Sequence, residues 1–70
     1  MNTYIITVGH TRVEAGAMST STRVVRKEEA DEVYVESTDG VLIGLKREGD
    51  GSATQLWAYK VWERFRLVKP

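Results

Sequence analysis

Residues 3–8 alternate between two faces and are rich in β-branched and aromatic side chains. This pattern predicts a β-strand in which Tyr4, Ile6 and Val8 share one face. Residues 9–12 follow as a predicted turn, because Gly9 can adopt backbone angles that other residues avoid. Residues 13–15 are then expected to return as a short second strand, which closes a β-hairpin.

Residues 17–31 are compatible with two structures. The spacing i, i+3, i+4, i+7 from Met18 to Val25 places four side chains on one face of a helix, and the following residues are good helix formers. The β-branched residues that alternate from Thr20 to Val24 favour a strand instead. We favour the helix, because a sheet this small needs an element that covers one of its faces.

The second half of the chain predicts strands. Residues 32–37 and 41–45 alternate on either side of Asp39 and Gly40, and an Asp-Gly pair in this position is a strong β-hairpin signal. Residues 48–53 contain two glycines and predict a loop. From Thr54 onward the alternation predicts either one long bent strand or two strands that are broken near Trp62 and Glu63.

These elements predict an α+β fold. A four- or five-stranded antiparallel sheet would carry one helix packed on one face, in a single domain that covers residues 1–70. The predicted core takes the inward apolar side chains of these elements: Ile6, Val8, Met18, Val25, Val33, Val35, Leu42 or Ile43, Leu45, Trp57, Tyr59, Val61 and Phe65.

The composition favours a small binding protein. The 70 residues are 41% hydrophobic and 29% charged, as in a soluble globular domain. There is no cysteine and only one histidine, His10, so we expect no enzyme, no metal site and no cofactor. No apolar run reaches the roughly 20 residues that span a membrane, and the N-terminus lacks the pattern of a signal peptide. We therefore expect a cytoplasmic protein without a membrane partner.

The ten basic residues balance the ten acidic ones, but the two kinds are segregated along the chain. Residues 28–39 contain six acidic residues and no basic one, whereas basic residues gather in segments 23–27 and 54–70. The net charge of zero disfavours strong non-specific binding to DNA. Local patches of either sign are still expected.

The candidate binding site is a strand face that combines basic and aromatic side chains. Strand alternation places Lys60, Trp62, Arg64 and Arg66 on one side. Such a face is typical of a platform for single-stranded nucleic acid, of a protein interface rich in Trp and Arg, and of a solvent-facing strand whose tryptophan is covered by another element. Three basic residues of the predicted helix would extend this binding face: Arg23, Arg26 and Lys27.

The order of predicted elements resembles that of small phage-encoded anti-CRISPR proteins that inhibit type I-F surveillance complexes. The matching segments open the first strand, lead into and follow the helix, and mark the later turn and strands: Tyr4–Ile6, Glu14–Ala15, Met18–Ser19, Arg23–Val24, Lys27–Glu28, Asp39–Gly40, Leu45–Lys46 and Trp57. After Arg47 the chain departs from that pattern, so no binding residue is transferred. The resemblance implies a helix over residues 18–30 and a stoichiometric inhibitor in a bacterial cytoplasm.

The sequence therefore predicts a non-enzymatic phage or mobile-element protein that inhibits a host protein complex, with a Cas effector complex as the expected partner. The alternative is a small nucleic-acid-binding module that uses the same basic and aromatic strand face. Either protein would be a monomer or a small homo-oligomer associated through its edge strands.

Overall fold

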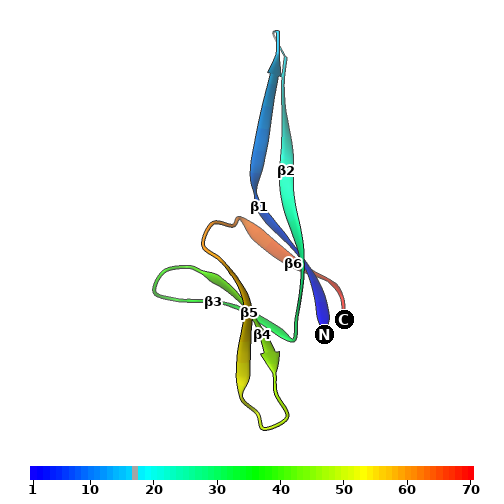
Figure 1. Cartoon of the computed structure of the whole chain (residues 1–70). Coiled ribbons are helices and arrows are strands. Elements are labelled where there is room, and N and C mark those ends of the chain that lie inside the picture. Colours follow the sequence, from blue (N-terminus) through cyan, green and yellow to red (C-terminus); the bar gives the residue numbers. More distant parts are fainter. Residues whose placement is uncertain (17) are drawn as a thin grey trace.

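The computed structural model describes residues 1–16 and 18–70, and in these residues the chain is all β (Figure 1). The strands form two three-stranded antiparallel sheets, with the orders β2-β1-β6 and β3-β4-β5. Their bounds are β1 Asn2–Ala15, β2 Met18–Ala30, β3 Glu32–Val35, β4 Leu42–Arg47, β5 Ala53–Tyr59 and β6 Arg64–Lys69. The predicted α+β fold with a single sheet is therefore wrong.

The segment predicted as a helix is strand β2, which pairs with β1 from Ala15 opposite Met18 to Asn2 opposite Ala30. The β-branched residues of β2 suit this extended conformation, and the long β1 supplies backbone partners along its whole length. The turn predicted at residues 9–12 is also wrong. The strand passes this point with a shift of register between residues 7 and 9, and the chain turns at Gly16, whose φ of 65° favours glycine.

The hairpin predicted at the Asp-Gly pair is confirmed. Strands β3 and β4 form the hairpin at the Asp-Gly pair, where Gly40 has a φ of 72° and the Glu36 N–H donates to the Val41 carbonyl (2.8 Å). Of the two alternatives for the C-terminal segment, the structure has two strands with the break near Trp62. Strand β5 stays in the second sheet, whereas β6 crosses to the first sheet and pairs with β1.

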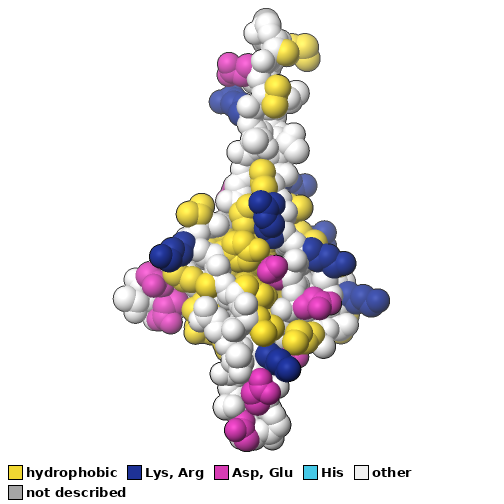
Figure 2. All heavy atoms as spheres, in the orientation of Figure 1, with side chains coloured by type: hydrophobic (Ala, Val, Ile, Leu, Met, Phe, Trp, Pro, Cys, Tyr) yellow, Lys and Arg dark blue, Asp and Glu magenta, His cyan; other side chains and the backbone are white. Residues whose placement is uncertain are grey.

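The core is small and lies where the two sheets meet, and Figure 2 shows hydrophobic side chains gathered there. Its buried apolar residues are Tyr4, Ile6, Ala30, Leu42 and Ile43. Of the predicted core, Ile6 is confirmed as buried, and so are both of the alternatives Leu42 and Ile43. Five predicted members are exposed instead, because they lie on the far hairpin end, in a connection or on open sheet surface: Met18, Val25, Val35, Val61 and Phe65.

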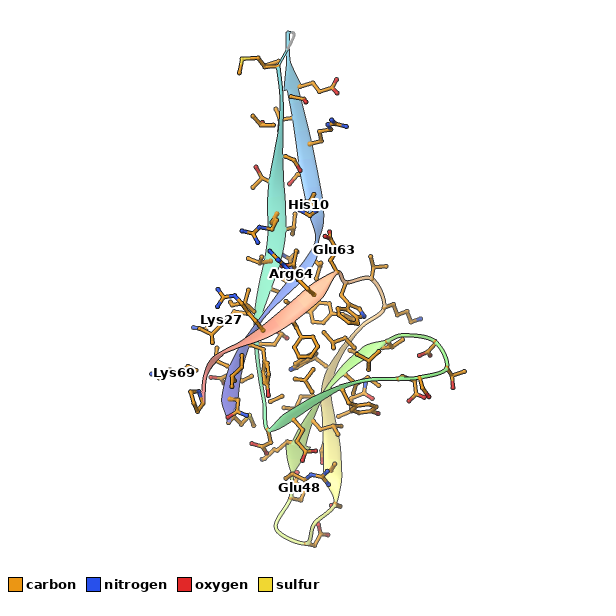
Figure 3. All side chains as sticks on the ribbon, turned by 180° about the vertical axis from the view of Figure 1, so that it is seen from behind. His10, Lys27, Glu48, Glu63, Arg64 and Lys69 are labelled. Carbon is orange, nitrogen blue, oxygen red and sulfur yellow. The ribbon has the colours of Figure 1, made fainter. Side chains whose placement is uncertain are left out.

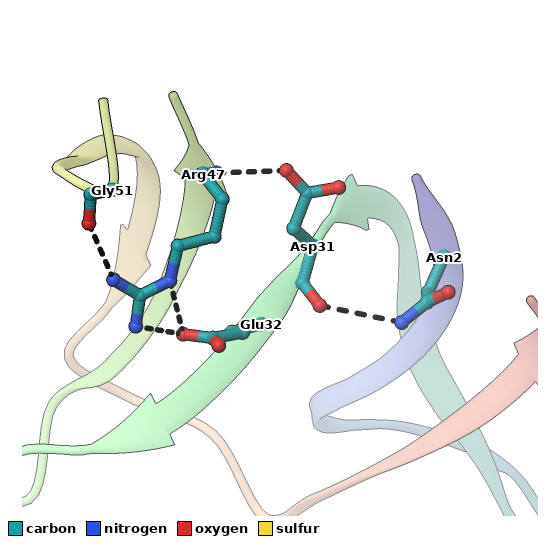
Figure 4. A network of polar contacts seen from close by, with 5 residues as sticks. All are labelled: Asn2, Asp31, Glu32, Arg47 and Gly51. Carbon is teal, nitrogen blue, oxygen red and sulfur yellow. Dashed lines mark hydrogen bonds and ion pairs between the residues drawn. The ribbon is translucent and has the colours of Figure 1, made fainter. Parts of the chain in front are cut away.

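Polar contacts join the two sheets where the chain passes from β2 to β3 (Figure 4). The Asp31 carboxylate accepts the Arg47 backbone N–H at 2.8 Å, and the Asn2 side-chain amide donates to the Asp31 carbonyl at 3.3 Å. Within the second sheet, the Arg47 guanidinium donates to Glu32 Oε2 through Nη2 at 2.7 Å and through Nε at 3.1 Å, which links β4 to β3. Separately, the Trp57 indole N–H donates to the Glu29 carbonyl at 3.0 Å, which ties β5 to β2.

The outer part of the β1-β2 hairpin projects from this body (Figure 1). We call residues 10–16 and 18–23 the arm, and all of them are exposed. The molecule measures 58 × 28 × 13 Å and has a radius of gyration of 15.4 Å. A compact domain of this length would have a radius of about 11 Å. The arm therefore makes the protein unusually elongated.

Candidate anion-binding face

One face of the first sheet collects basic side chains from two strands that are distant in sequence. Residues directly opposite each other in a sheet point to the same side. Three cross-strand rows from β2 through β1 to β6 form this face: Val25–Thr7–Arg64, Lys27–Ile5–Arg66 and Glu29–Thr3–Lys69. Arg23 lies two residues before Val25 on β2 and extends the same side toward the arm. We call Arg23, Lys27, Arg64, Arg66 and Lys69 the basic face.

The three arginines of the basic face border an open hollow of about 670 Å³. Ile5 and Val25 give it an apolar floor, and Arg23, Arg64 and Arg66 line it as well. Figure 3 shows Lys27, Arg64 and Lys69 along one flank at the base of the arm, far from Glu48 at the opposite end of the molecule. Guanidinium and ammonium groups arranged in this way can bind the oxygens of phosphates or carboxylates.

The cations of the basic face make no ion pair among the described residues, and the face also carries one carboxylate, Glu29. The ion pairs among the described residues are His10 with Glu63 at 2.8 Å and Arg47 with Glu32 at 2.7 Å, and neither involves the basic face. The fold also separates the two signs of charge. The first sheet, residues 1–30 and 64–70, carries seven basic and three acidic residues, a net +4, whereas residues 31–63 carry three basic and seven acidic residues, a net −4. Figure 2 shows acidic side chains at both hairpin ends of the second sheet.

Of the residues predicted for the site, Arg23, Lys27, Arg64 and Arg66 are brought together on the basic face. Arg26 is on the opposite side of the sheet, directly across from Ile6. There it lies near Tyr59, whose pKa is raised by burial and by the neighbouring Glu28, while Arg26 opposes the rise.

The predicted stacking platform does not form, because Lys60 and Trp62 lie in the connection between β5 and β6. The half-buried Trp62 indole donates its N–H to the Gly40 carbonyl at 2.8 Å, and its ring is tilted at 59° against Phe65 with centroids 6.0 Å apart. Trp62 is therefore half-buried in the connection, where it contacts the β3-β4 turn and Phe65.

Lys69 belongs to the basic face although its odd number places it opposite to Arg64 and Arg66 by simple alternation. The pairing of β6 with β1 shifts between Thr3 and Tyr4, so Lys69 lies across from Thr3 and on the same side as the arginines. Ile5 and Thr7, which lie at the centre of this face, were also not predicted. An irregularity of this kind has no signal in the sequence of β6, and it depends on the partner strand.

One further charged contact lies beside the basic face. The single histidine, His10, pairs with Glu63 on the surface at the base of the arm. Among the described residues, no group of His, Asp or Glu side chains has the arrangement of a metal site, and no helix is long and apolar enough to cross a membrane. Comparisons with protein-family models, curated proteins and solved structures find no match.

Proposed function

We propose that this protein is a non-enzymatic binding module that attaches to the sugar–phosphate backbone of nucleic acid through its basic face. The observation that carries the proposal is the position of five cations on one side of one sheet, none of them in an ion pair within the described structure. Arginine and lysine side chains of this kind supply most phosphate contacts in nucleic-acid complexes.

The expected salt dependence follows from the number of cations. If all five contact phosphates of a duplex, the slope of log K against log salt concentration is about −4.5, and affinity falls about 500-fold between about 50 and 200 mM salt. A face that contacts phosphates through two cations only would give a slope near −1.8. The measured slope therefore reports how much of the basic face takes part.

The predicted role of this protein as an inhibitor of a host complex stays a prediction. Its resemblance to anti-CRISPR proteins included a helix over residues 18–30, and that segment is strand β2. The geometry adds no contact that favours it over the phosphate-binding role. A pull-down after nuclease treatment separates the two, since a protein complex would survive the nuclease and a nucleic-acid partner would not.

The direct test compares two double variants with the same change of net charge. Arg64→Gln/Arg66→Gln removes two cations from the basic face, and Lys46→Gln/Lys60→Gln removes two cations outside it. Anisotropy of a labelled duplex, measured over a range of salt, should show weaker binding and a slope smaller by about 1.8 for the first variant only. Equal losses in both variants, or no binding by the wild type at low salt, would overturn the proposal. Far-UV circular dichroism checks that both variants are folded.

A further inference from the structure

The arm is a two-stranded hairpin that is exposed to solvent on both faces. A two-stranded hairpin is marginally stable in water unless further strands or a packing partner support it. The chain has an accessible surface of 5124 Å², whereas a compact protein of this mass exposes about 4,400 Å². Much of the additional surface lies on the arm, whose residues are all exposed, and this favours a partner that surrounds it.

The two faces of the arm have different chemistry. One face consists of charged or hydrogen-bonding side chains, paired across the strands as His10–Arg23, Arg12–Ser21 and Glu14–Ser19. Four of these residues, His10, Arg12, Ser19 and Ser21, line a second shallow hollow. The other face is uncharged and pairs Thr11–Thr22, Val13–Thr20 and Ala15–Met18. Arg23 belongs to the polar face of the arm and to the basic face, so the two surfaces are continuous.

We propose that the arm enters the major groove of a nucleic-acid duplex, with its polar face toward the base edges, while the basic face holds the adjoining phosphates. This inference rests on the proposed function and names the form of nucleic acid. A major groove about 12 Å wide admits a two-stranded β-ribbon, whose strands lie about 4.8 Å apart. The side chains of the polar face are of the kinds that read bases there, since arginine pairs with guanine and serine hydrogen-bonds to several bases.

The positions of the aromatic rings favour a duplex over a single strand. Single strands are held by rings on which successive bases stack. The Phe65 ring lines the hollow beside the basic face, but it packs edge-on against Tyr4, with centroids 6.2 Å apart, and is tilted against Trp62. The cross-strand rows of the basic face contain no aromatic side chain, and the described residues of the arm contain one, His10, which pairs with Glu63. Because the Phe65 ring already packs against Tyr4 and Trp62, the basic face suits a nucleic acid whose bases are already paired.

The test uses an arm shortened without a change of net charge. Replacing residues 12–21 by Asn-Gly joins Thr11 to Thr22, which are direct cross-strand partners, through a two-residue turn. The removed segment contains one basic residue, Arg12, and one acidic residue, Glu14. The probes are a duplex, the same duplex with glucosylated 5-hydroxymethylcytosine, whose sugars fill the major groove, and one strand alone. Circular dichroism and urea unfolding confirm that the shortened protein keeps its body.

We expect the full-length protein to bind the unmodified duplex roughly tenfold more tightly than the other two probes, and the shortened protein to lose this difference. Val13→Ala/Thr20→Ala, on the uncharged face, should bind like the wild type. Equal binding of both duplexes by the full-length protein, or a preference for the single strand, would overturn the groove proposal. The phosphate-binding function would survive that result if Arg64→Gln/Arg66→Gln still weakened binding. If the full-length protein bound none of the three probes at low salt, both proposals would be overturned.

Discussion

Gly44 lies directly beneath the Trp57 indole, and this contact should make Gly44→Ala strongly destabilising. A Cβ atom at Gly44 would lie 2.7 Å from Trp57 Cδ2 and even closer to Cε2 and Cζ2. Carbon atoms pack at about 3.5–4.0 Å, so the ring would have to move. Because Gly44 and Trp57 are direct partners in the ladder between β4 and β5, the backbone leaves little freedom to open the space.

The size of the effect follows from what the displaced ring would lose. Overpacking a well-packed site costs about 1–3 kcal/mol. Movement of the indole would also break its hydrogen bond to the Glu29 carbonyl, worth about 1 kcal/mol, and its T-shaped contact with Tyr59, worth about 0.5–1.5 kcal/mol. Since the ring relieves the overlap by giving up these contacts, we expect a total loss of about 2–4 kcal/mol. A domain of this size has about 4–10 kcal/mol in all.

Urea unfolding followed by far-UV circular dichroism measures this loss without depending on tryptophan emission. The matched control is Gly49→Ala, where an added Cβ meets nothing within 4 Å. With an m-value near 1–2 kcal/mol/M, Gly44→Ala should lower the midpoint by about 2 M, and Gly49→Ala should change it little. In the background of Trp57→Ala, Gly44→Ala should cost much less, because the ring is gone. If Gly44→Ala cost the same in both backgrounds, the proposed overlap with the indole would be refuted.

Three further predictions concern the turn, the junction and alkaline pH. Gly40→Ala places a side chain at a φ of 72° and should cost about 1 kcal/mol in urea unfolding, whereas Gly9→Ala, at an open position without a positive φ, should cost less. Asp31→Ala removes the carboxylate that accepts the Arg47 backbone N–H and should cost about 1 kcal/mol, and a thermal shift below 1 °C would contradict this. The pKa of Tyr59 is raised above 10.0 by burial, so the folded protein holds this proton more firmly than the unfolded chain. Its contribution is complete below about pH 10 and is lost as pH rises through the raised pKa. Tyr59→Phe should therefore flatten the fall in unfolding free energy above about pH 10.

The hairpin of β3 and β4 could be predicted because its signals are local. The Asp-Gly pair fixes the turn, and the alternation on both sides indicates two strands. It does not fix burial, because Val35 is exposed and the neighbours Leu42 and Ile43 are both buried. The segment from Met18 to Ala30 could not be assigned in this way, because its first eight residues fit both a helical and a strand period. Its structure is decided by β1, a partner strand of 14 residues that continues past Gly9, where the sequence predicted a turn. Tertiary pairing overrode the local helix preference at the end of the segment.

The candidate site was predictable to the extent that it follows strand alternation. Arg64 and Arg66 share a face, as the spacing indicates, and Arg23 and Lys27 join them because β2 is a strand and not the helix that was expected. Arg26 was assigned to the same patch, yet alternation along β2 turns it to the other side. Trp62 could not be placed, because the break between β5 and β6 depends on contacts with Gly40 that are distant in sequence.

The segregation of charge between the two sheets bears on how a chain of zero net charge could bind a polyanion. At about 0.15 M salt the Debye length is about 8 Å, well below the 58 and 28 Å extents of the molecule. A phosphate on the basic face would then respond to the nearby cations and hardly to the acidic second sheet. At about 0.01 M salt the Debye length is about 30 Å, and the acidic sheet is no longer screened.

We therefore expect log K to rise linearly as salt is lowered toward about 50 mM and to flatten below it, as anisotropy titrations would show. Neutralising acidic residues of the second sheet, as in Glu36→Gln/Asp39→Asn, should restore part of the rise at low salt and change binding little at high salt. A strictly linear dependence down to the lowest salt, unaffected by that variant, would mean that the acidic sheet lies outside the reach of the bound phosphates.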